Sequence, residues 1–265
     1  MPHKGCPHQC SFCNQKHITG VADDVTSEVV RDTIDLYLTT IDPKHRIEVA
    51  FYGGSFTAID EDYQNELLQV AYEYVQSGKI QGIRLSTRPD AIDDGILQNL
   101  KKHSVTEIEL GVQSMCDDVL KLNNRGHSAR DVVDASKLIR QHGFSLGLQM
   151  MVGLIGDDRE KSVYTAYEIA KLNPDFVRIY PTLVFNNTAL GDFYKKGEYI
   201  PLSLDAAVNI CRDISDIFDE FNIKIIRMGL YLSDEADIEN CLAGPYHPRF
   251  RELVNTLPQR KNSSE

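Results

Sequence analysis

The sequence predicts an α/β fold in which parallel strands are joined by crossover helices, and more specifically a partial or complete α/β barrel. Strand-like and helix-like segments alternate along almost the whole chain, as they do in successive βα units. The chain has 265 residues and 42% hydrophobic content, which suits one large barrel domain. The regular alternation favours a barrel over a doubly wound sheet.

The helices are expected from amphipathic spacing and from residues that cap helix ends. Thr26 or Ser27 should cap the first helix, and Gly143 should end the fourth. The expected helices cover about residues 26–42, 61–76, 94–102, 129–143, 160–171 and 204–221.

The expected strands cover residues 47–52, 83–87, 107–113, 146–152, 176–180 and 224–228. One face of these strands is apolar and should pack on the helices. It carries Ile47, Val49, Phe51, Ile83, Leu85, Ile108, Leu110, Val112, Leu148, Met150, Val152, Val177 and Ile179. The opposite face is polar and carries Glu48, Tyr52, Arg84, Ser86, Glu109, Gln113, Gln149, Arg178, Tyr180 and Arg227.

A polar strand face has consequences for the inside of a barrel. A closed eight-stranded barrel fills its interior with branched apolar side chains. A polar interior is costly unless it is wet or holds a polar ligand, so we expect an open, lined cavity. The alternative is a self-satisfied ion-pair network of Arg84, Arg178 and Arg227 with Glu48 and Glu109, which does not exclude the cavity.

Three cysteines, Cys6, Cys10 and Cys13, lie close together near the start of the chain. Thiols this close in one short loop cannot all pair as disulfides, and they favour convergence on one metal centre. Three cysteine ligands leave one iron of a four-iron cluster open to an outside ligand, which indicates chemistry rather than structure. Two alternatives stay open: reduced surface thiols, or a zinc knuckle with His3, His8 or His17 as fourth ligand.

The spacing of these cysteines, with Phe12 just before Cys13, resembles the radical S-adenosylmethionine (radical SAM) superfamily. The resemblance implies a 4Fe-4S cluster on Cys6, Cys10 and Cys13, with S-adenosylmethionine chelating the open iron. In that superfamily the reduced cluster cleaves S-adenosylmethionine to methionine and a 5′-deoxyadenosyl radical. An external one-electron donor of the ferredoxin or flavodoxin type is then required. The implied fold is a partial (β/α) TIM-like barrel of the radical SAM type.

Two strand ends in the first half of the chain match the same superfamily. Gly53, Gly54 and Ser55 fall where its members have a Gly-Gly-Glu-like turn that approaches S-adenosylmethionine, although Ser55 replaces the acidic residue. The segment Ser86-Thr87-Arg88-Pro89-Asp90 resembles a block of the Elongator catalytic subunit, which would place Ser86 beside the cofactor. A plain strand-ending turn and a turn hydroxyl are the structural alternatives.

A more specific match joins Gly111-Val112-Gln113-Ser114 to Asn124-Arg125-Gly126-His127-Ser128. It resembles a block shared by the Elongator catalytic subunit and the oxygen-independent coproporphyrinogen oxidases, in which the glutamine and the arginine contact S-adenosylmethionine. By this resemblance Gln113 and Arg125 are cofactor residues. Gln149 stands where the porphyrinogen oxidases carry a ribose-binding aspartate. These side chains could also be an inward-facing amide and a solvated arginine.

The resemblance covers about residues 5–255 and gives a domain scheme. We expect a radical SAM barrel over residues 1–235 and a short C-terminal extension over 236–265. Only four residues precede Gly5, so we expect the first barrel strand to be missing from this chain. The acetyltransferase domain of Elongator is not expected either. The stretches Ile226–Leu230 and Gly244–Pro248 also resemble the Elongator-like bacterial group, without an evident role.

Composition limits the compartment and the partners. The chain has six cysteines without paired spacing and no signal peptide or membrane span, which favours a reducing, cytoplasmic location. Cys116, Cys211 and Cys241 are isolated and are expected to be structural. The formal net charge of −11 gives no general electrostatic footprint for nucleic acid, so weak binding of a tRNA substrate is expected from this chain alone.

Three functional hypotheses follow. The leading one is a radical SAM enzyme of the Elongator-like group, with tRNA modification as one outcome and an RNA substrate as a partner. The second is an enzyme like the coproporphyrinogen oxidases, whose propionate-bearing substrate calls for a cationic mouth that the acidic balance disfavours. The third is a zinc-binding interaction module without catalytic activity.

Overall fold

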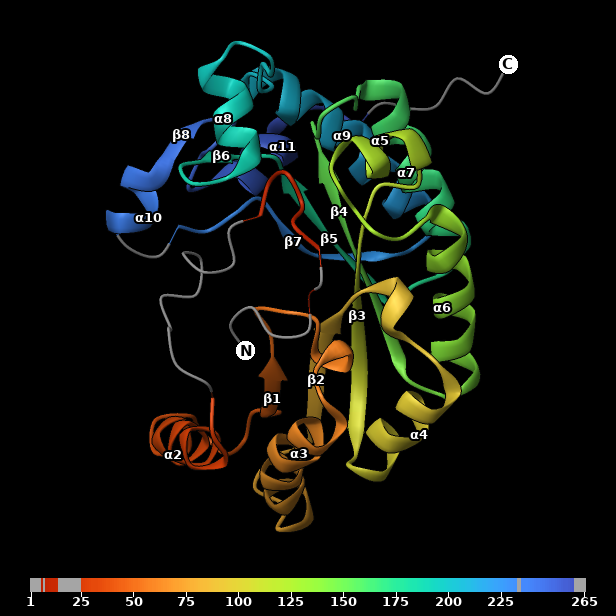
Figure 1. Cartoon of the computed structure of the whole chain (residues 1–265), viewed down its shortest axis with the longest axis vertical. Helices are drawn as coiled ribbons and strands as arrows, with labels where there is room; N and C mark the ends of the chain where they lie inside the picture. Colours follow the sequence, from red (N-terminus) through yellow and green to blue (C-terminus); the bar gives the residue numbers. More distant parts are fainter. Residues whose placement is uncertain (1–5, 7, 14–24, 233–234, 260–265) are drawn as a thin grey trace. The chain divides into compact units, whose positions relative to one another are not determined.

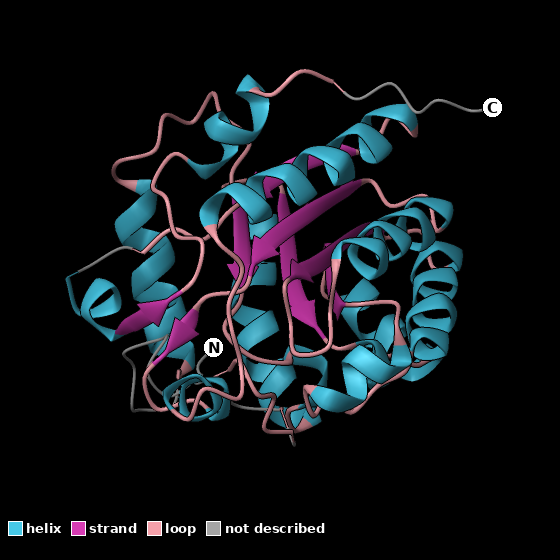
Figure 2. Ribbon diagram, turned by 90° about the horizontal axis from the view of Figure 1, so that it is seen from above, coloured by secondary structure: helices cyan, strands magenta, loops and turns pink. Residues whose placement is uncertain are grey.

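The computed structural model describes Cys6 and residues 8–13, 25–232 and 235–259. These residues form two compact units. The first contains Cys6, residues 25–111 and residues 134–146, and the second contains residues 8–13, 112–133 and 147–259. In both units helices and strands alternate along the chain. Figure 2 shows the helices in cyan and the strands in magenta.

The first unit is built from βα repeats (Figure 1). Strands β1 and β2 pair in parallel, with Val49 opposite Ile83, and β2 pairs in parallel with β3, with Leu85 opposite Ile108. The elements are α2 (Ser27–Leu38), β1 (Glu48–Phe51), η1 (Phe56–Ala58), α3 (Glu61–Gln76), β2 (Gly82–Thr87), η2 (Pro89–Ala91), α4 (Asp94–Lys102) and β3 (Val105–Gln113).

The second unit continues the alternation. Strands β4 and β5 pair in parallel, as do β5 and β7, whereas the short β6 and β8 are antiparallel. Its elements are α5 (Asp117–Leu122), α6 (Ala129–Gln141), β4 (Ser145–Val152), α7 (Arg159–Lys171), β5 (Phe176–Pro181), β6 (Val184–Phe185), α8 (Ala189–Lys195), α9 (Leu204–Glu220), β7 (Lys224–Met228), α10 (Glu235–Asn240), β8 (Cys241–Ala243) and α11 (Phe250–Thr256). The end of α6 and the start of β4 belong to the first unit.

Side-chain caps explain why several helices begin where the sequence predicts. The Thr26 hydroxyl accepts a hydrogen bond from the Val29 N–H at the start of α2. Asp60 does the same for α3 and Asp93 for α4, so each satisfies backbone donors that have no partner inside the helix. The predicted bounds of α3 and α4 are those observed.

The first helix is shorter than predicted, because it ends at Leu38 rather than near residue 42. The hydroxyls of Thr39 and Thr40 donate hydrogen bonds to the carbonyls of Leu36 and Tyr37. Such bonds compete with continuation of the helical ladder. The prediction also omitted α5, α8, α10, α11 and the β6–β8 pair, which are all short.

The apolar face of the strands forms the core, as predicted. Ile83, Leu85, Ile108, Leu110 and Val112 are fully buried. Leu148, Met150, Val152, Val177 and Ile179 are fully buried in the second unit. Ile47 and Val49 are only half-buried, and β1 begins after Ile47. Cys211 is fully buried, which agrees with a structural thiol, whereas Cys116 and Cys241 are half-buried.

The polar face of the first unit is a charge network around Arg84. Its guanidinium lies 2.9 Å from a Glu109 oxygen and 3.5 Å from a Glu48 oxygen, and it also contacts Glu107. Glu109 is fully buried and accepts a further hydrogen bond from the Tyr52 hydroxyl. The ion-pair network expected for this face is therefore confirmed for Arg84. Among the described residues, no helix is both long and apolar enough to cross a membrane.

Candidate functional site

Backbone hydrogen bonds hold the segment around Cys10 in the second unit. Cys10 is 5% exposed and the next residue, Ser11, is fully buried. The Ser11 N–H donates to the Asn123 carbonyl at 3.1 Å, and the Leu190 N–H donates to the Ser11 carbonyl at 2.7 Å. The Cys13 N–H donates to the Cys10 carbonyl at 3.1 Å, which closes a turn between two of the predicted ligands.

Asn123 is the centre of this anchorage, and the sequence analysis did not single it out. Its side chain accepts a hydrogen bond from the Ser11 hydroxyl at 2.7 Å and donates to the carbonyls of Val119 and Ile155 at 2.8 and 2.9 Å. Its oxygen also accepts from the Ile155 N–H at 3.3 Å. Asn123 is 1% exposed, so these bonds replace water almost completely. The only signal in the sequence was its place just before the Asn124–Ser128 block.

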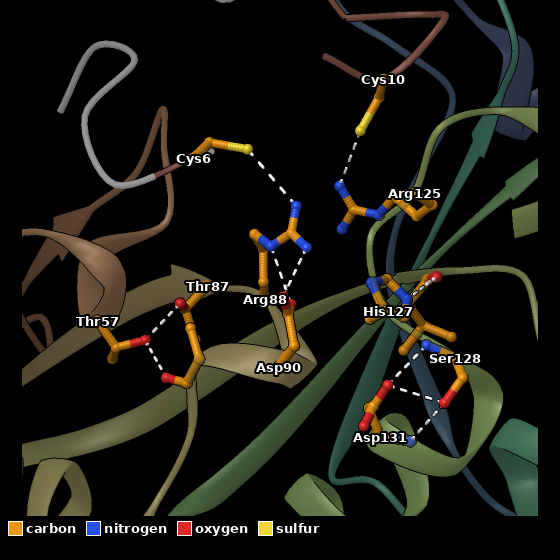
Figure 3. A network of polar contacts seen from close by, with 12 residues as sticks. Cys6, Cys10, Thr57, Thr87, Arg88, Asp90, Arg125, His127, Ser128 and Asp131 are labelled. Atoms are coloured by element: carbon orange, nitrogen blue, oxygen red, sulfur yellow. Dashed lines mark hydrogen bonds and ion pairs between the residues drawn. The ribbon is translucent and has the colours of Figure 1, made fainter. Parts of the chain in front are cut away.

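The Asn124–Ser128 block packs directly on the cysteine segment. The Arg125 guanidinium donates to the Cys10 sulfur at 3.5 Å, as Figure 3 shows. A side chain at Gly126 would come within 2.1 Å of the His8 ring, so only glycine fits there without movement. Ser128 and Asp131 exchange hydrogen bonds and cap the following helix. Arg125, assigned by resemblance to S-adenosylmethionine, therefore contacts a thiol in this structure.

Gln113 lies at a strained turn at the end of β3. Its φ is +68°, and the Ser114 N–H donates to the Val112 carbonyl at 2.9 Å, two residues back. This is a γ-turn with a positive central φ, a rare and strained conformation. His127 Nε2 also lies 3.1 Å from the Val112 carbonyl, so it donates to the same oxygen. The Gln113 side-chain oxygen is buried and has no hydrogen-bond partner among the described residues. A buried amide oxygen without a partner is expected where the amide hydrogen-bonds a cofactor.

The first unit contains the third cysteine, Cys6, next to Arg88. One guanidinium nitrogen of Arg88 donates to the Cys6 sulfur at 3.6 Å, and two others bind the Asp90 carboxylate at 2.9 and 2.8 Å (Figure 3). Arg88 is 2% exposed. Burial opposes its charge, but Asp90 and Cys6 outweigh burial and raise the pKa of the guanidinium. Arg88 was part of a quoted motif, yet the sequence analysis selected only Ser86.

The Gly53–Ser55 turn and the Ser86–Asp90 segment are tied together in the same unit. Gly53 has a φ of +98°, a conformation that favours glycine. Ser55 is buried, and its carbonyl accepts from the Ala58 N–H at 3.0 Å. The hydroxyls of Thr57 and Thr87 lie 2.6 Å apart, and Thr57 also donates to the Ala91 carbonyl (Figure 3). Ser86 is half-buried on β2, directly before Thr87.

Gln149 is half-buried on β4, where it is in register with Arg178 of β5. The structure thus places Gln113, Arg125 and Gln149 in the second unit with Cys10 and Cys13, and Gly53, Gly54, Ser55 and Ser86 in the first unit with Cys6. The joint pocket predicted for these residues stays a prediction, as does the open cavity.

The donor set fits an iron–sulfur cluster. Two of the three cysteines receive an N–H from a guanidinium, and hydrogen bonds to sulfur are a means by which proteins tune cluster potentials. Among the described residues no group of three or more His, Cys, Asp or Glu side chains is gathered closely enough to hold a metal ion. Convergence of Cys6, Cys10 and Cys13 on one cluster therefore stays a prediction. The alternative zinc ligands His3 and His17 lie outside the described residues.

Comparison with known proteins decides the family. The family model described as the radical SAM superfamily matches residues 1–165, and the model described as the radical SAM C-terminal domain matches residues 174–257. The chain belongs to the radical SAM superfamily. Its 4Fe-4S cluster and S-adenosylmethionine are the cofactors of this family.

The relatives include Elongator proteins. The chain is 29% identical to a tRNA uridine(34) acetyltransferase of Dehalococcoides mccartyi over 70% of this chain and 45% of that protein. It is 30% identical to Elongator complex protein 3 of Dictyostelium discoideum over 62% of this chain and 33% of that protein. The matched part of the chain thus spans less than half the length of these curated relatives.

Solved structures agree on the fold. The archaeal Methanocaldococcus infernus Elp3 with an N-terminal deletion matches with a TM-score of 0.73 at 25% identity, covering 86% of this chain and 57% of that chain. Coproporphyrinogen III oxidase from Escherichia coli, a radical SAM enzyme, matches with a TM-score of 0.61 at 18% identity, covering 83% and 51%. The predicted partial (β/α) TIM-like barrel of the radical SAM type is confirmed as the fold class, and this radical SAM protein is Elongator-like.

Proposed function

We propose that this radical SAM protein modifies a uridine base of tRNA. The observation that carries the proposal is the paired arrangement of cysteine and guanidinium: Arg88 on Cys6 and Arg125 on Cys10. The choice of tRNA rests on the relatives, which are tRNA uridine(34) acetyltransferases and Elongator proteins. The net charge of −11 does not suit the propionates of a porphyrinogen substrate.

The proposed roles follow from the residues. Cys6, Cys10 and Cys13 would hold the 4Fe-4S cluster, while Gly53, Gly54, Ser55, Ser86, Gln113, Arg125 and Gln149 would contact S-adenosylmethionine. When bound, the cluster and S-adenosylmethionine supply a 5′-deoxyadenosyl radical. The chain itself contributes positioning: the turn at Gln113 presents a buried amide, and Arg88 and Arg125 donate N–H groups toward the thiols.

The remaining expectations belong to the same proposal. An electron source is general for radical SAM enzymes, and a ferredoxin or a flavodoxin is proposed here as the donor. A cytoplasmic location and a barrel domain over residues 1–235 followed by a short extension are likewise proposed. Binding of tRNA by this chain alone should be weak because of its acidic balance, and tight, salt-sensitive binding would contradict this expectation.

The test begins with anaerobic reconstitution of the protein with iron and sulfide. Incubation with S-adenosylmethionine and a strong reductant should yield methionine and 5′-deoxyadenosine. Cys10→Ala should lose the cluster and this cleavage together, because three cysteines are the minimum set for the site. Cys116→Ala is the matched control, since burial raises the pKa of the isolated Cys116 thiol and keeps it protonated; it should load iron normally.

Two further results decide the proposal. Nucleoside analysis of tRNA after turnover should show a modified uridine that is absent when Cys10→Ala is used. A protein that isolates with zinc rather than iron, or a Cys10→Ala variant that keeps a full cluster, would contradict the cluster assignment. If S-adenosylmethionine is cleaved but the tRNA stays unmodified, tRNA is not the substrate, and only the cleavage of S-adenosylmethionine remains in the proposal.

A further inference from the structure

Two stretches without an assigned role, Ile226–Leu230 and Gly244–Pro248, lead into the same surface pocket of the second unit. The pocket has a volume of about 300 Å³ and is lined by Arg227 and Tyr231 from the first stretch and the residue after it, and by His247, Arg249 and Arg251 from the second and the residues after it. Residues that are far apart in the sequence are thus brought to one place, and most of those named carry a cation or a nitrogen donor.

The walls of this pocket are fixed by packing around Gly229. Gly229 has a φ of +90°, and a Cβ added there would come within 2.9 Å of the Phe250 Cβ. Its N–H donates to the Ile179 carbonyl at 3.0 Å, which ties the end of β7 to β5. Phe250 is 3% exposed, and its N–H donates to the His247 carbonyl at 3.1 Å. The turn after β7 and the start of α11 therefore pack tightly against each other.

Arg227 is an unusual cation in this acidic chain. It is half-buried at the pocket, and its side chain makes no hydrogen bond or ion pair with any of the other residues that the structure describes. Its neighbour in register on β5 is a second arginine, Arg178. Arg84, in contrast, contacts the three carboxylates Glu48, Glu107 and Glu109. Withdrawing a guanidinium from water without a counter-charge is costly, which favours a ligand that supplies the charge.

The other charged side chains of the pocket also leave an excess of positive charge. Arg251 is exposed at the pocket, and its side chain likewise makes no hydrogen bond or ion pair within the described part of the chain. The carboxylate at the pocket is Glu252, and it is already bound by Arg249. Two guanidinium groups thus remain available to an anion, and no carboxylate of the pocket is left to oppose it.

We propose that this pocket binds the phosphate group of a nucleotide. The planar fork of a guanidinium matches two phosphate oxygens. A phosphate monoester, with its two negative charges, matches two arginines better than a ligand with a single carboxylate does. Tyr231 is 67% exposed at the rim and offers a ring on which a nucleobase stacks. The volume of about 300 Å³ lies at the lower end of the range for small-molecule sites, about 300–1,000 Å³.

The proposal goes beyond the proposed function and does not depend on it. A nucleotide at this pocket could be free or part of an RNA strand. Both present phosphate oxygens to the guanidinium groups, but the monoester carries two charges and the diester of a strand carries one. The test therefore measures binding without turnover, so failure of the tRNA chemistry leaves it intact.

Calorimetric titration at low ionic strength would use inorganic phosphate, uridine 5′-monophosphate and uridine as separate ligands. We expect saturable binding of both phosphate ligands, weakened by added salt, and none of uridine. Arg227→Gln should weaken the nucleotide by about tenfold or more, since a charged hydrogen-bonded contact is lost. Tyr231→Ala should reduce uridine monophosphate affinity toward that of inorganic phosphate. A short uridine-rich RNA strand competing with the monophosphate would identify a strand as the source.

Arg31→Gln is the control for net charge, because Arg31, on α2 of the first unit, is paired with Glu73 of α3. It should bind nucleotide like the wild type. Arg251→Gln, at an exposed position, repeats the test if Arg227→Gln does not fold. The proposal is overturned if the wild type binds neither phosphate ligand, or if Arg227→Gln or Arg251→Gln binds both as the wild type does.

Discussion

Cys6 and Cys10 receive the same kind of hydrogen bond but are supported in different ways. Each sulfur accepts an N–H from a guanidinium, Arg88 at 3.6 Å in the first unit and Arg125 at 3.5 Å in the second. Beside Cys6 the support is a side-chain clamp, in which Asp90 holds Arg88 with two hydrogen bonds. Beside Cys10 it is a buried network, in which Asn123 and Leu190 hold the backbone of Ser11.

The two kinds of support are expected to affect different properties, the cluster beside Cys6 and the stability of the fold beside Cys10. A clamp between two side chains can be altered while the backbone of its unit stays paired. The network around Asn123 joins two loop segments, at Ser11 and Ile155, to helix α5, which carries Val119, so its loss exposes several buried polar groups together. We therefore expect substitutions beside Cys10 to cost mainly stability, and substitutions beside Cys6 to change mainly the properties of the bound cluster.

The largest effect is expected for Asn123→Ala. The Ser11 hydroxyl and the Ile155 N–H and carbonyl would lose the Asn123 side chain in a site that is 1% exposed, whereas the Val119 carbonyl keeps the bond from the Asn123 backbone N–H. Unsatisfied buried groups of this kind cost about 1–3 kcal/mol each before relaxation, so a loss of about 3 kcal/mol in the free energy of unfolding is expected. Urea denaturation measures it, and iron loading should fall as well.

Asn124→Ala makes the same chemical change at the next residue and serves as its control. Asn124 is exposed and has a φ of +51°, which alanine adopts less readily than asparagine. The free energy of unfolding should fall by only about 1 kcal/mol in this variant. Equal losses in the two variants would show that the Asn123 network is not what fixes the Cys10 segment.

A smaller effect on stability is expected for Arg88→Met. Asp90 would lose its two hydrogen bonds from Arg88, but its side chain is 27% exposed and can turn to water, so the loss in the free energy of unfolding should be about 1–2 kcal/mol. Removing a cation and an N–H donor from a cluster sulfur disfavours the more negative, reduced state. The midpoint potential of the reconstituted cluster should become more negative, which a redox titration measures. An unchanged potential would place Arg88 outside the cluster environment.

The same contrast shows what the sequence could predict. Helices α3 and α4 have the predicted bounds, because each starts at an aspartate cap and follows a clear amphipathic pattern. The β6–β8 pair was missed because its register joins Val184 to Ala243, and two short segments so far apart give no local signal. Asn123 and Arg88 lie beside or within motifs that were quoted, yet their partners are set by tertiary packing. Local patterns thus predicted the elements and the motif blocks, and left out the residues that support the thiols.

Asp157 gives the smallest predicted effect, and it acts through the Cys10 network. Its carboxylate accepts from the Gly153 N–H at 2.8 Å and from the Ser162 hydroxyl at 2.7 Å. It thereby closes the turn that carries Ile155, one of the residues bound to Asn123. Burial raises the pKa of Asp157 above the usual carboxyl value, although both hydrogen bonds act in the opposite direction.

The sign of the pH dependence follows from that raised pKa. Between the unfolded pKa and the higher folded pKa, the folded state binds more protons than the unfolded state, so the carboxyl contributes a loss of stability as pH rises through this window. Asp157→Asn keeps an oxygen that accepts both bonds and has no proton to lose. Its free energy of unfolding relative to wild type should therefore increase with pH across the window and level off above it, as urea denaturation at several pH values would show.

Ser162→Ala removes a bond that lowers the pKa of Asp157, so the free energy of unfolding of this variant should fall more steeply with pH than that of the wild type. A relative stability of Asp157→Asn that is flat or falls with pH would contradict a raised pKa for Asp157 in the folded protein, and the Cys10 network would then not depend on pH through this carboxyl.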